Sequence, residues 1–472
     1  MSSFFVKDMK AKYVSPTIAR NTSGLMSKHG HVAAAALDRP FDEIDGASIE
    51  ELVREHGSPL YVFSEETLRK KYRDAYRAFS VRYPKVQFAW SYKTNYLAAI
   101  CNVFHSEGSI AEVVSDFEYE KARKLGVPGN QIIFNGPYKS YEILCRAAAE
   151  GAKIQIDNAQ EIVLLERIAR ETGRTIPVAI RVTMDTGNQP AWKKFGFCYE
   201  NGDALRTLQR LAASDGLKLV GLHAHIGTFI LDPGQYKAAT TALLNLARQF
   251  KEQFSQSIEY VNLGGGFASA STLHYQYLPG SEVVPSFTQY AEAICDTLNE
   301  NLPNDRSKPT LYLETGRALV DEAGYLITTV LDSRRTGEGR QSAILDAGVN
   351  LLYTSAWYKY NIRPARQRDD AKFPTTLYGP LCMNIDVVRD DVPLGSLQPG
   401  DRLVVHPVGA YNITQSMQFI TYRPAVVMVG AAGQVDVIRK RENLEHVEAL
   451  EVLPQRLNGC ALNGQGPVNG RP

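Results

Sequence analysis

Short apolar runs alternate with amphipathic helical stretches from Glu65 to about Asp321. EETLRKKYRDAYRAF at residues 65–79 is one such helical stretch. The apolar runs are VQFAWSY, IAEVVS, QIIFN, KIQID, VAIRV, LVGLHAH, IEYVNL and TLYLE. Repeated βα units predict a parallel sheet. Eight units within about 250 residues predict a closed (β/α)8 barrel, and a doubly wound open sheet is the alternative that this pattern allows.

The pattern changes after Tyr325. Short alternating strands separated by Gly, Pro and Asp turns are expected at AILDAG, DRLVVHPVG, QFITYRPAVVMVG and QVDVIRKRE. They predict an antiparallel β domain, which the strand-like run LYVF at Leu60–Phe63 is expected to join. The predicted organisation is a flexible extension (1–33), a segment joining the β domain (34–64), the barrel (65–325), the β-rich domain (326–452) and a flexible tail (453–472).

Composition and charge narrow the class of protein. The chain has 472 residues, of which 44% are hydrophobic and 22% charged, and its formal net charge is +1. Without a sustained basic stretch, neither a nucleic acid nor a membrane is an expected partner. We therefore expect an enzyme or a binding protein.

The cysteines and the amino terminus bear on location. The chain has six cysteines, which lie far apart and form no CxxC pair. Neither a metal site nor a disulfide framework is therefore indicated, and a reducing cytoplasm fits best. The start MSSFFVKDMKAKY lacks the apolar run of a signal peptide, and no later stretch is apolar enough to span a bilayer.

In a closed barrel, the loops after all eight strands converge at one face, where function collects. Each apolar run is followed by polar or glycine residues, in chain order Lys93, Ser115, Asn135, Asp157, Arg181, His223 and His225, Gly264–Gly266, and Glu314 with Arg317. Taken singly, a lysine after a strand is usually a surface charge. The GGG sequence fits neither a dinucleotide loop nor a P-loop. Together they predict a rim that binds an anionic, planar ligand.

Seven motifs in order resemble one known family. They are SYKTN around Lys93, GLHAHIGT around His225, NLGGGF, LETGRALV around Glu314, ILDAGVN, GPLCMNID around Cys382 and VGAYN around Tyr411. This series resembles the fold-type III pyridoxal-phosphate decarboxylases, typified by diaminopimelate and ornithine decarboxylase, from about Gly57 to Glu442. The resemblance implies a barrel like that of alanine racemase, the cofactor pyridoxal 5'-phosphate, and the decarboxylation of an amino acid.

The resemblance also implies roles for residues. Lys93 is expected to form a Schiff base with the cofactor, and Glu314 to face the pyridine nitrogen. A phosphate dianion needs donors, which are expected from the amides of Gly264, Gly265 and Gly266 and from Arg317, Thr228 and Tyr411. The remaining cofactor contacts are expected from His225 stacked on the ring, Arg181 near the phenolic oxygen, Glu112 beside the lysine, and Gly316.

The β domain is expected to complete the site. In the family, the segment matching GPLCMNID enters the partner subunit's active site, where Cys382 would act as the acid that protonates the product. This implies a homodimer with two shared sites. The alternative is a buried cysteine in a β turn. Substrate contacts are expected from Tyr358, Arg363, Met383 and Asp386.

Two departures from the family pattern concern the substrate. Diaminopimelate decarboxylases have a pattern like DAGMNDLIRPALY, and this chain has DAGVNLLYTSAWY, with Thr354 and Ser355 in place of Arg-Pro. The usual CESGD appears as CMNID at residues 382–386. Unless Arg363, Arg366 or Lys359 substitutes, both anchors for the distal end of meso-diaminopimelate are missing. We therefore expect a non-standard or conjugated amino acid as the substrate.

Two other functions remain open on the sequence. An amino-acid racemase of the alanine racemase type shares the barrel and the cofactor, but it releases no carbon dioxide. A non-catalytic binding homologue, like the antizyme inhibitors, would lack cofactor residues, whereas Lys93, Glu314, Arg317 and Cys382 are present.

Overall fold

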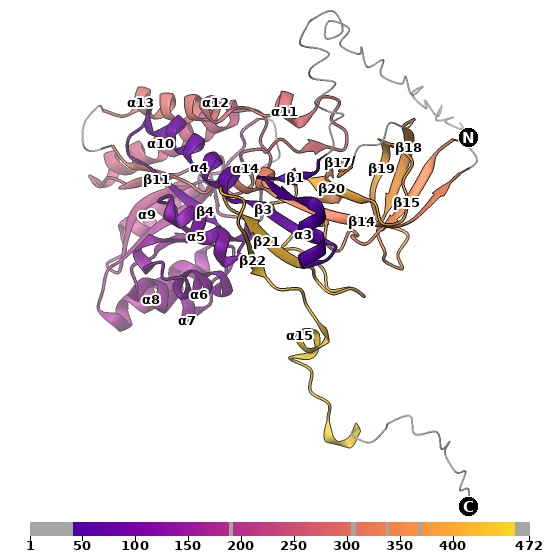
Figure 1. Ribbon diagram of the computed structural model, residues 1–472. Helices are drawn as coiled ribbons and strands as arrows, with labels where there is room; N and C mark the ends of the chain where they lie inside the picture. The colour runs from indigo at the N-terminus through magenta and orange to yellow at the C-terminus, as the bar shows by residue number, and fades with distance from the viewer. Residues whose placement is uncertain (1–40, 188–191, 304–307, 337–338, 367–370, 458–472) are drawn as a thin grey trace, which may run out of the picture.

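The computed structural model describes residues 41–187, 192–303, 308–336, 339–366 and 371–457 (Figure 1). The predicted extension, 1–33, and most of the predicted tail therefore lie outside the described residues. Within these ranges, no helix has both the length and the apolar character needed to cross a membrane. The five cysteines that the structure describes are free.

Eight parallel strands form a closed barrel. They are β4 (Val86–Ser91), β5 (Ile110–Val113), β6 (Ile132–Phe134), β7 (Lys153–Ile156), β8 (Ile176–Thr183), β10 (Leu217–His223), β11 (Tyr260–Asn262) and β13 (Thr310–Leu313). The order β10-β11-β13-β4-β5-β6-β7-β8 is closed by pairing between β10 and β8. This pairing confirms the barrel and rules out the open sheet. The short β9 (Phe197–Cys198) extends β8.

Helices cover the outside of the barrel, as Figure 1 shows on the indigo-to-magenta side of the molecule. The longer ones are α4 (Glu65–Ser80), α5 (Ala98–Ser106), α6 (Asp116–Lys124), α7 (Tyr141–Ala149), α8 (Ala159–Thr172), α9 (Asp203–Ala212) and α10 (Gly234–Phe254). After β11, the shorter α11 (Gly280–Val283), α12 (Phe287–Ala291) and α13 (Thr297–Asn301) follow, with a π-helical turn at Glu292–Asp296. Serine or asparagine side chains cap α4, α6, α7 and α8 by accepting amides of the first turn.

A second sheet follows the barrel. Its order is β19-β18-β15-β14-β3-β21-β22, and β20 pairs with both β14 and β17. The strands are β3 (Leu60–Ser64), β14 (Gly324–Arg335), β15 (Gln341–Leu345), β17 (Asn361–Pro364), β18 (Phe373–Tyr378), β19 (Val387–Leu394), β20 (Arg402–His406), β21 (Ala425–Val429) and β22 (Val435–Arg439). Most pairings are antiparallel, but β3 with β21 and β15 with β18 are parallel.

Smaller elements complete the fold. Ahead of β3 lie the hairpin β1 (Glu43–Ile44) and β2 (Ala47–Ser48) and the helix α3 (Ile49–His56). The pair β12 (Thr272–Leu273) and β16 (Tyr358–Lys359) joins a barrel loop to the β domain. The helix α14 (Arg317–Val320) leads from the barrel into β14, and α15 (Leu444–Glu448) lies near the carboxyl end.

One predicted strand is only partly present. QFITYRPAVVMVG forms a strand only at Ala425–Val429, and the residues before it make bends. Arg423 holds these bends, because its backbone amide donates to Glu442 and its Nε donates to Ser416 Oγ. Pro424 lacks an amide hydrogen and cannot extend the ladder.

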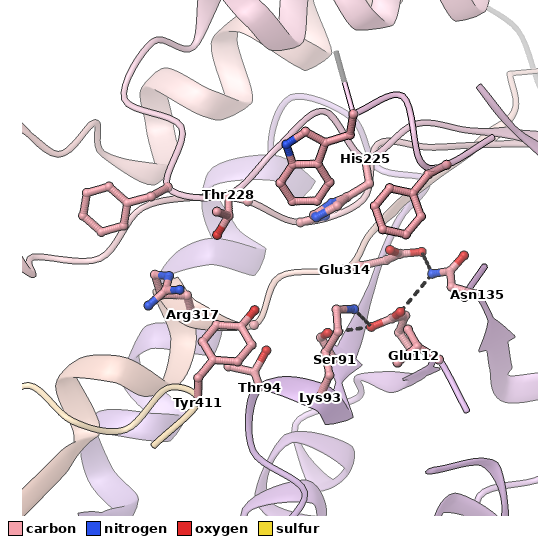
Figure 2. A pocket seen from close by; sticks show the side chains of 18 of the residues that line it. Ser91, Lys93, Thr94, Glu112, Asn135, His225, Thr228, Glu314, Arg317 and Tyr411 are labelled. Carbon is pink, nitrogen blue, oxygen red and sulfur yellow. Dashed lines mark hydrogen bonds and ion pairs between the residues drawn. The ribbon is translucent and has the colours of Figure 1, made fainter. Parts of the chain in front are cut away.

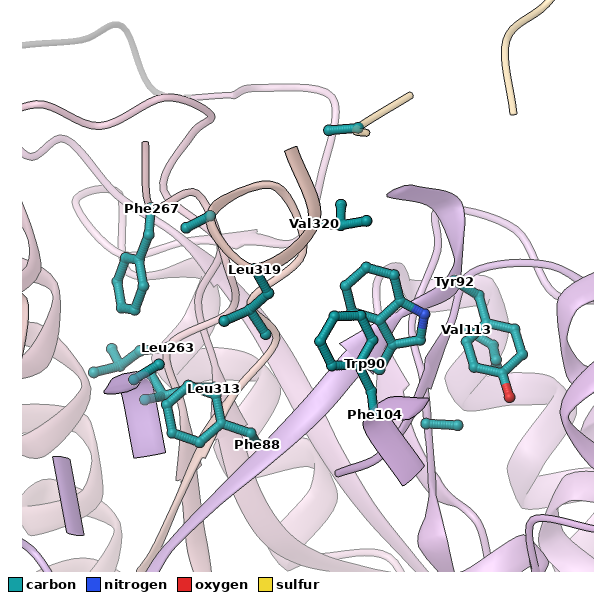
Figure 3. Close-up of a cluster of buried hydrophobic side chains, with 14 of the residues drawn as sticks. Phe88, Trp90, Tyr92, Phe104, Val113, Leu263, Phe267, Leu313, Leu319 and Val320 are labelled. Atoms are coloured by element: carbon teal, nitrogen blue, oxygen red, sulfur yellow. The ribbon is translucent and has the colours of Figure 1, made fainter. Parts of the chain in front are cut away.

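The main hydrophobic core lies between the barrel strands and the outer helices (Figure 3). Phe88 and Trp90 of β4 face this core, and Trp90 stacks on Phe104 of α5 with ring centroids 4.1 Å apart. Leu319 and Val320 of α14 belong to the same cluster. The core therefore supports the strand that leads to Lys93 and the helix that begins at Arg317.

Candidate active site

The positions of the polar site residues are explained by the two-residue period of the strands. Ala89, Ile110 and Ile133 form with Tyr312 a small cluster apart from the main core, as expected for side chains that fill the barrel. Side chains two residues apart on a strand point to the same face. At the carboxyl ends of six strands, the residue two positions after an inward-facing residue is polar, and these residues are Ser91, Glu112, Asn135, Arg181, Asn262 and Glu314. The barrel thus directs these side chains into one space.

Lys93 lies in a 3-10 turn directly after β4 and forms an ion pair. Its Nζ is 2.6 Å from Glu112 Oε2, and the same oxygen accepts a hydrogen bond of 2.5 Å from Ser91 Oγ. Burial opposes the charged form, but the carboxylates of Glu112 and Glu314 outweigh it and raise the pKa of Lys93. The side chain of Lys93 is therefore held as an ammonium ion that pairs with Glu112.

Glu314 is a buried carboxylate supported by two amides. Its Oε1 accepts hydrogen bonds of 2.7 Å from Asn135 and 2.6 Å from Asn262, and its Oε2 is 3.5 Å from His223 Nε2. Burial favours the neutral acid, but attraction to His223 and Lys93 and these hydrogen bonds outweigh it. The pKa of Glu314 therefore lies below its ordinary value. The group remains a carboxylate at neutral pH.

The other end of the site holds a cation without a partner. Arg317 is 7% exposed, and its Nε and Nη1 are buried without a hydrogen-bond partner among the residues that the structure describes. Its guanidinium carbon lies 4.7 Å from the ring centre of Tyr411 and 5.0 Å from that of Tyr358. Because buried donors are nearly always satisfied, this arrangement indicates a site for an anion.

The glycine loop passes between these two ends. Gly264 and Gly266 have φ values of 64° and 100°, in the region that favours glycine. A Cβ on Gly265 would lie 2.3 Å from the carbonyl oxygen of Glu314, so the loop packs directly against the acid's backbone. The amide of Gly265 also donates to His225 Nδ1 over 3.1 Å.

His225 and Arg181 border the middle of the site. Burial and the nearby Arg181 and Lys93 hold the pKa of His225 well below its ordinary value, so the imidazole is neutral and Nδ1 accepts the Gly265 amide. The indole of Trp192 contacts His225 edge to face, with ring centres 5.5 Å apart. Arg181 Nη1 lies 3.4 Å from Asp157 Oδ1, and its guanidinium covers the ring of Phe195 at 4.2 Å.

Most of these groups line one cavity of about 660 Å³. Figure 2 shows Arg317, Thr228 and Tyr411 at one end and Glu314, Glu112 and Asn135 at the other, with His225 and Lys93 between them. A planar ligand with a phosphate at one end and a ring nitrogen at the other matches this polarity. The unpartnered Arg317 and the ionised Glu314 therefore fit pyridoxal phosphate.

The structure brings most of the predicted site residues together. The cavity is lined by Lys93, Glu112, Arg181, His225, Thr228, Gly265, Gly266, Glu314, Gly316, Arg317, Tyr358 and Tyr411. Gly264 does not line it but lies in the same loop, against His225.

Four predicted residues lie outside the cavity of their own chain. Cys382 is exposed and Met383 is partly exposed, in the turn between β18 and β19. Asp386 is buried, and its two carboxylate oxygens accept the amides of Val349 and Leu381 over 2.8 Å each. The side chain of Asp386 therefore holds the turn, and its expected contact to the substrate stays a prediction. Arg363, on β17, covers the ring of Phe41 at 5.2 Å.

Several lining residues were not assigned a role from the sequence. Asn135 and His223 are predicted from the sequence only as strand ends. Asn262 does not line the cavity but donates to Glu314 Oε1, and it is recognisable by its position two residues after the inward-facing Tyr260. Ser91 is recognisable in the same way. Loops contribute Trp192, Lys194, Phe195 and Trp357, which no pattern in the sequence marks as site residues.

Comparison with known proteins agrees with this geometry. The model of the pyridoxal binding domain of the pyridoxal-dependent decarboxylases matches residues 66–321. The diaminopimelate decarboxylase of Bacillus subtilis is 30% identical over 443 residues, which cover 90% of this chain and 96% of that protein. The diaminopimelate decarboxylase of Methanothermobacter thermautotrophicus is 30% identical over 88% of this chain and 96% of its own length.

A solved structure is similar throughout its length. The crystal structure of diaminopimelate decarboxylase from M. jannaschii in complex with L-lysine has a TM-score of 0.79 and 29% identity, covering 88% of this chain and 96% of that one. The lysine/ornithine decarboxylase of Vibrio vulnificus, at 22% identity and a TM-score of 0.69, shares the fold.

The fold and site define a pyridoxal-phosphate enzyme built on a barrel and a β domain. The chain belongs to the pyridoxal-dependent decarboxylase family to which diaminopimelate decarboxylases belong. It is a carboxy-lyase that binds pyridoxal 5'-phosphate and acts on an amino acid.

Proposed function

We propose that this decarboxylase uses Lys93, Glu314 and Arg317 as the three fixed contacts of its cofactor. The observation that carries the proposal is the polarity of the cavity. A buried carboxylate lies at one end, an unpartnered buried guanidinium at the other, and a lysine paired with an acid between them. Pyridoxal phosphate, when bound, supplies an electron sink for the bond that breaks as the carboxylate leaves.

The side chains of the chain then have separate tasks. Glu112 Oε2, 2.6 Å from Lys93 Nζ, accepts the proton that the ammonium must lose before it can react as an amine. The carboxylate of Glu314 holds a proton on a ring nitrogen placed beside it. The neutral imidazole of His225 covers one face of the site without adding charge. Arg317, with Thr228 and Tyr411, binds the anionic end.

The second part of the proposal is a homodimer with shared sites. Cys382 is exposed, and its turn also carries Ile385, which is 73% exposed. Neither residue lines the cavity of its own chain. A second copy that covers this turn would bury the isoleucine and bring the thiol to the other copy's cavity as a proton donor. A cytoplasmic location stays a prediction from the cysteine spacing.

Mixing two inactive variants tests the shared site. Lys93→Ala and Cys382→Ala remove groups from different parts of the fold. If each site takes its lysine from one copy and its cysteine from the other, subunits exchanged at equal amounts regain about a quarter of the wild-type carbon dioxide release. If both groups come from one chain, mixing restores no activity. Lys93→Arg mixed with Lys93→Ala is the control and stays inactive under either arrangement.

The third part concerns the substrate, which we propose is a non-standard or conjugated amino acid. Thr354, at the position of the family's arginine, is 2% exposed and bonds within the β domain to Tyr360 and Asn412. Of the possible substitutes, Arg366 pairs with Glu50 over 3.3 Å, and neither Arg363 nor Lys359 lines the cavity. The remaining walls carry the aromatic rings of Trp192, Phe195 and Trp357 and one further cation, Lys194, whose Nζ lies over the ring of Phe195 at 5.4 Å. Walls that are mostly aromatic, with a single cation, favour a distal group other than the paired ammonium and carboxylate of meso-diaminopimelate.

Carbon dioxide release from a panel of amino acids tests the substrate. The panel contains meso-diaminopimelate, lysine, ornithine, arginine and amino acids whose side-chain amine carries an acyl or citryl group. We expect the highest kcat/KM for a conjugate and its loss in Lys93→Ala. Turnover of meso-diaminopimelate above every conjugate would contradict the proposal. Conversion to the other enantiomer without carbon dioxide would instead support a racemase.

A further inference from the structure

Asp321 is a buried carboxylate that does not line the cavity but is bonded to the segments around it. It directly follows α14, the helix that begins at Arg317, and is 3% exposed. Its Oδ2 accepts the hydroxyl groups of Ser269 and Ser271, the latter over 2.8 Å. Its Oδ1 accepts the amide of Ala410 over 3.2 Å. Three donors from two distant segments therefore meet on one side chain.

Each of these segments carries a proposed contact to the cofactor phosphate. Ser269 lies three residues after Gly266, at the exit of the glycine loop. Ala410 precedes Tyr411, whose φ of 66° lies in the left-handed region that a tyrosine rarely adopts. Because such a conformation is strained for a residue with a side chain, contacts around Tyr411 must hold it. The bond from the Ala410 amide to Asp321 is one of them.

The Ala410 segment is in turn bonded to the turn of Lys93. The amide of Tyr411 donates to the carbonyl of Thr94 over 2.9 Å, and Thr414 Oγ1 donates to the carbonyl of Lys93 over 3.0 Å. The main chains of this segment and of Asp321 are also in direct contact, since the Gly409 amide donates to the Asp321 carbonyl over 3.0 Å. A Cβ on Gly409 would lie 1.9 Å from the carbonyl oxygen of Val320. The segment therefore has little freedom to shift along α14.

We propose that Asp321 is a positioning residue for the phosphate end of the cofactor site. Its carboxylate fixes the glycine loop, the helix of Arg317 and the segment of Tyr411 relative to one another. A carboxylate suits this place because it accepts hydrogen bonds from every side and donates none, and all of its donors come from hydroxyls and an amide. The inference rests on the proposed placement of the phosphate beside Arg317.

Comparing two forms of the cofactor separates positioning from general stability. Pyridoxal lacks the phosphate but keeps the ring and the aldehyde, so the ratio of the dissociation constants for pyridoxal and pyridoxal phosphate measures the phosphate site alone. The ratio is measured by absorbance titration of the full chain freed of cofactor. The variants are Asp321→Asn, in which an amide group replaces one acceptor, and Arg317→Gln. The matched control is Asp346→Asn, because Asp346 accepts one hydroxyl and one amide, from Thr328 and Thr329, within the β domain.

We expect Asp321→Asn to lower the ratio at least tenfold by weakening pyridoxal phosphate binding, with pyridoxal binding unchanged, and Asp346→Asn to leave the ratio unchanged. The role of Asp321 would be overturned if Asp321→Asn has the same ratio as the control while Arg317→Gln loses the preference for pyridoxal phosphate over pyridoxal. If Arg317→Gln itself keeps the preference, the phosphate placement is wrong instead. Should Asp321→Asn fail to fold, Ser271→Ala removes one donor and keeps the carboxylate. A smaller fall in the ratio supports the proposal, and an unchanged ratio overturns it.

Discussion

Lys139 and Glu161 form a buried ion pair behind the cavity wall, and replacing either should destabilise the barrel strongly. The lysine side chain is 0% exposed and that of Glu161 3%. Lys139 Nζ donates to both carboxylate oxygens of Glu161, at 3.0 and 2.9 Å, and to the carbonyls of Gly136 and Gln155. Lys139→Met keeps much of the volume but leaves a buried carboxylate whose remaining donor is the amide of Asp157.

The size of the effect follows from burial. Removing one partner of a buried ion pair costs about 3–5 kcal/mol of unfolding free energy, because the other charge stays without a counterion. Glu161→Leu should cost a similar amount, because it leaves the buried ammonium of Lys139 without a counterion. The double variant Lys139→Met/Glu161→Leu leaves no buried charge, so it should lose at least about 2 kcal/mol less than the sum of the single losses. Two carbonyls and one amide lose the hydrogen bond to Lys139 or Glu161, so the double variant stays less stable than the wild type.

Urea unfolding followed by tryptophan fluorescence and by circular dichroism measures these four proteins. Trp90 lies in the barrel core and reports on this part of the fold. The surface pair Lys218 and Glu259, 2.7 Å apart and more than half exposed, provides the control, for which single losses should be below about 1 kcal/mol. If the losses of Lys139→Met and Glu161→Leu add up in the double variant within about 0.5 kcal/mol, the two residues are not coupled and the reasoning is refuted.

Three further changes test other groups. Glu314→Gln should lower kcat at least about 100-fold while the cofactor still binds, because an amide cannot hold a proton on a ring nitrogen; an unchanged kcat in steady-state assays would contradict this role. Burial and the nearby Glu112 raise the pKa of Glu118 to about 7, so its favourable contribution to the free energy of unfolding is present at low pH and lost as pH rises through 7. Relative to Glu118→Gln, the free energy of unfolding of the wild type should therefore fall by up to about 3 kcal/mol between about pH 5 and 8. A constant difference between the thermal unfolding curves of the two proteins at all pH values would argue against this pKa. Asp386→Ala should lower the free energy of unfolding by about 2–4 kcal/mol, because it removes the acceptors of two amides. KM stays unchanged if the side chain only holds the turn, whereas a raised KM at normal stability would support the expected substrate contact.

The barrel was predictable because its strands and helices differ in hydrophobic period. Each apolar run is short and bounded by polar residues, and the structure has a strand in all eight. The failure at QFITYRPAVVMVG has a local cause. Its first half has the aromatic and β-branched residues of a strand, but it stays in bends because the amide and the Nε of Arg423 donate to Glu442 and Ser416, and because Pro424 lacks an amide hydrogen. Composition cannot reveal such contacts.

The cofactor end of the site was predictable for a geometric reason. Residues at the ends of parallel strands must meet, so Lys93, Arg181 and Glu314 converge however the loops fold. Trp192 and Trp357 reach the cavity from loops, and their positions depend on contacts such as the bond from the His274 amide to the Trp357 carbonyl. Residues placed by such contacts give no periodic signal. The substrate end is therefore less predictable than the cofactor end.

Thr354 shows why the substrate end differs in physical terms. Its hydroxyl bonds to Tyr360 over 2.7 Å, and Asn412 Oδ1 accepts the amide of Thr354 over 3.0 Å. Asn412 adjoins Tyr411, so the position where the family pattern has an arginine is here part of the structure that holds Tyr411, a proposed contact of the cofactor phosphate. A guanidinium there would have to be buried among uncharged partners. Thr354 is thus part of an uncharged polar network in the β domain. The proposed substrate preference rests on this whole segment, in which Trp357 and Tyr358 line the cavity.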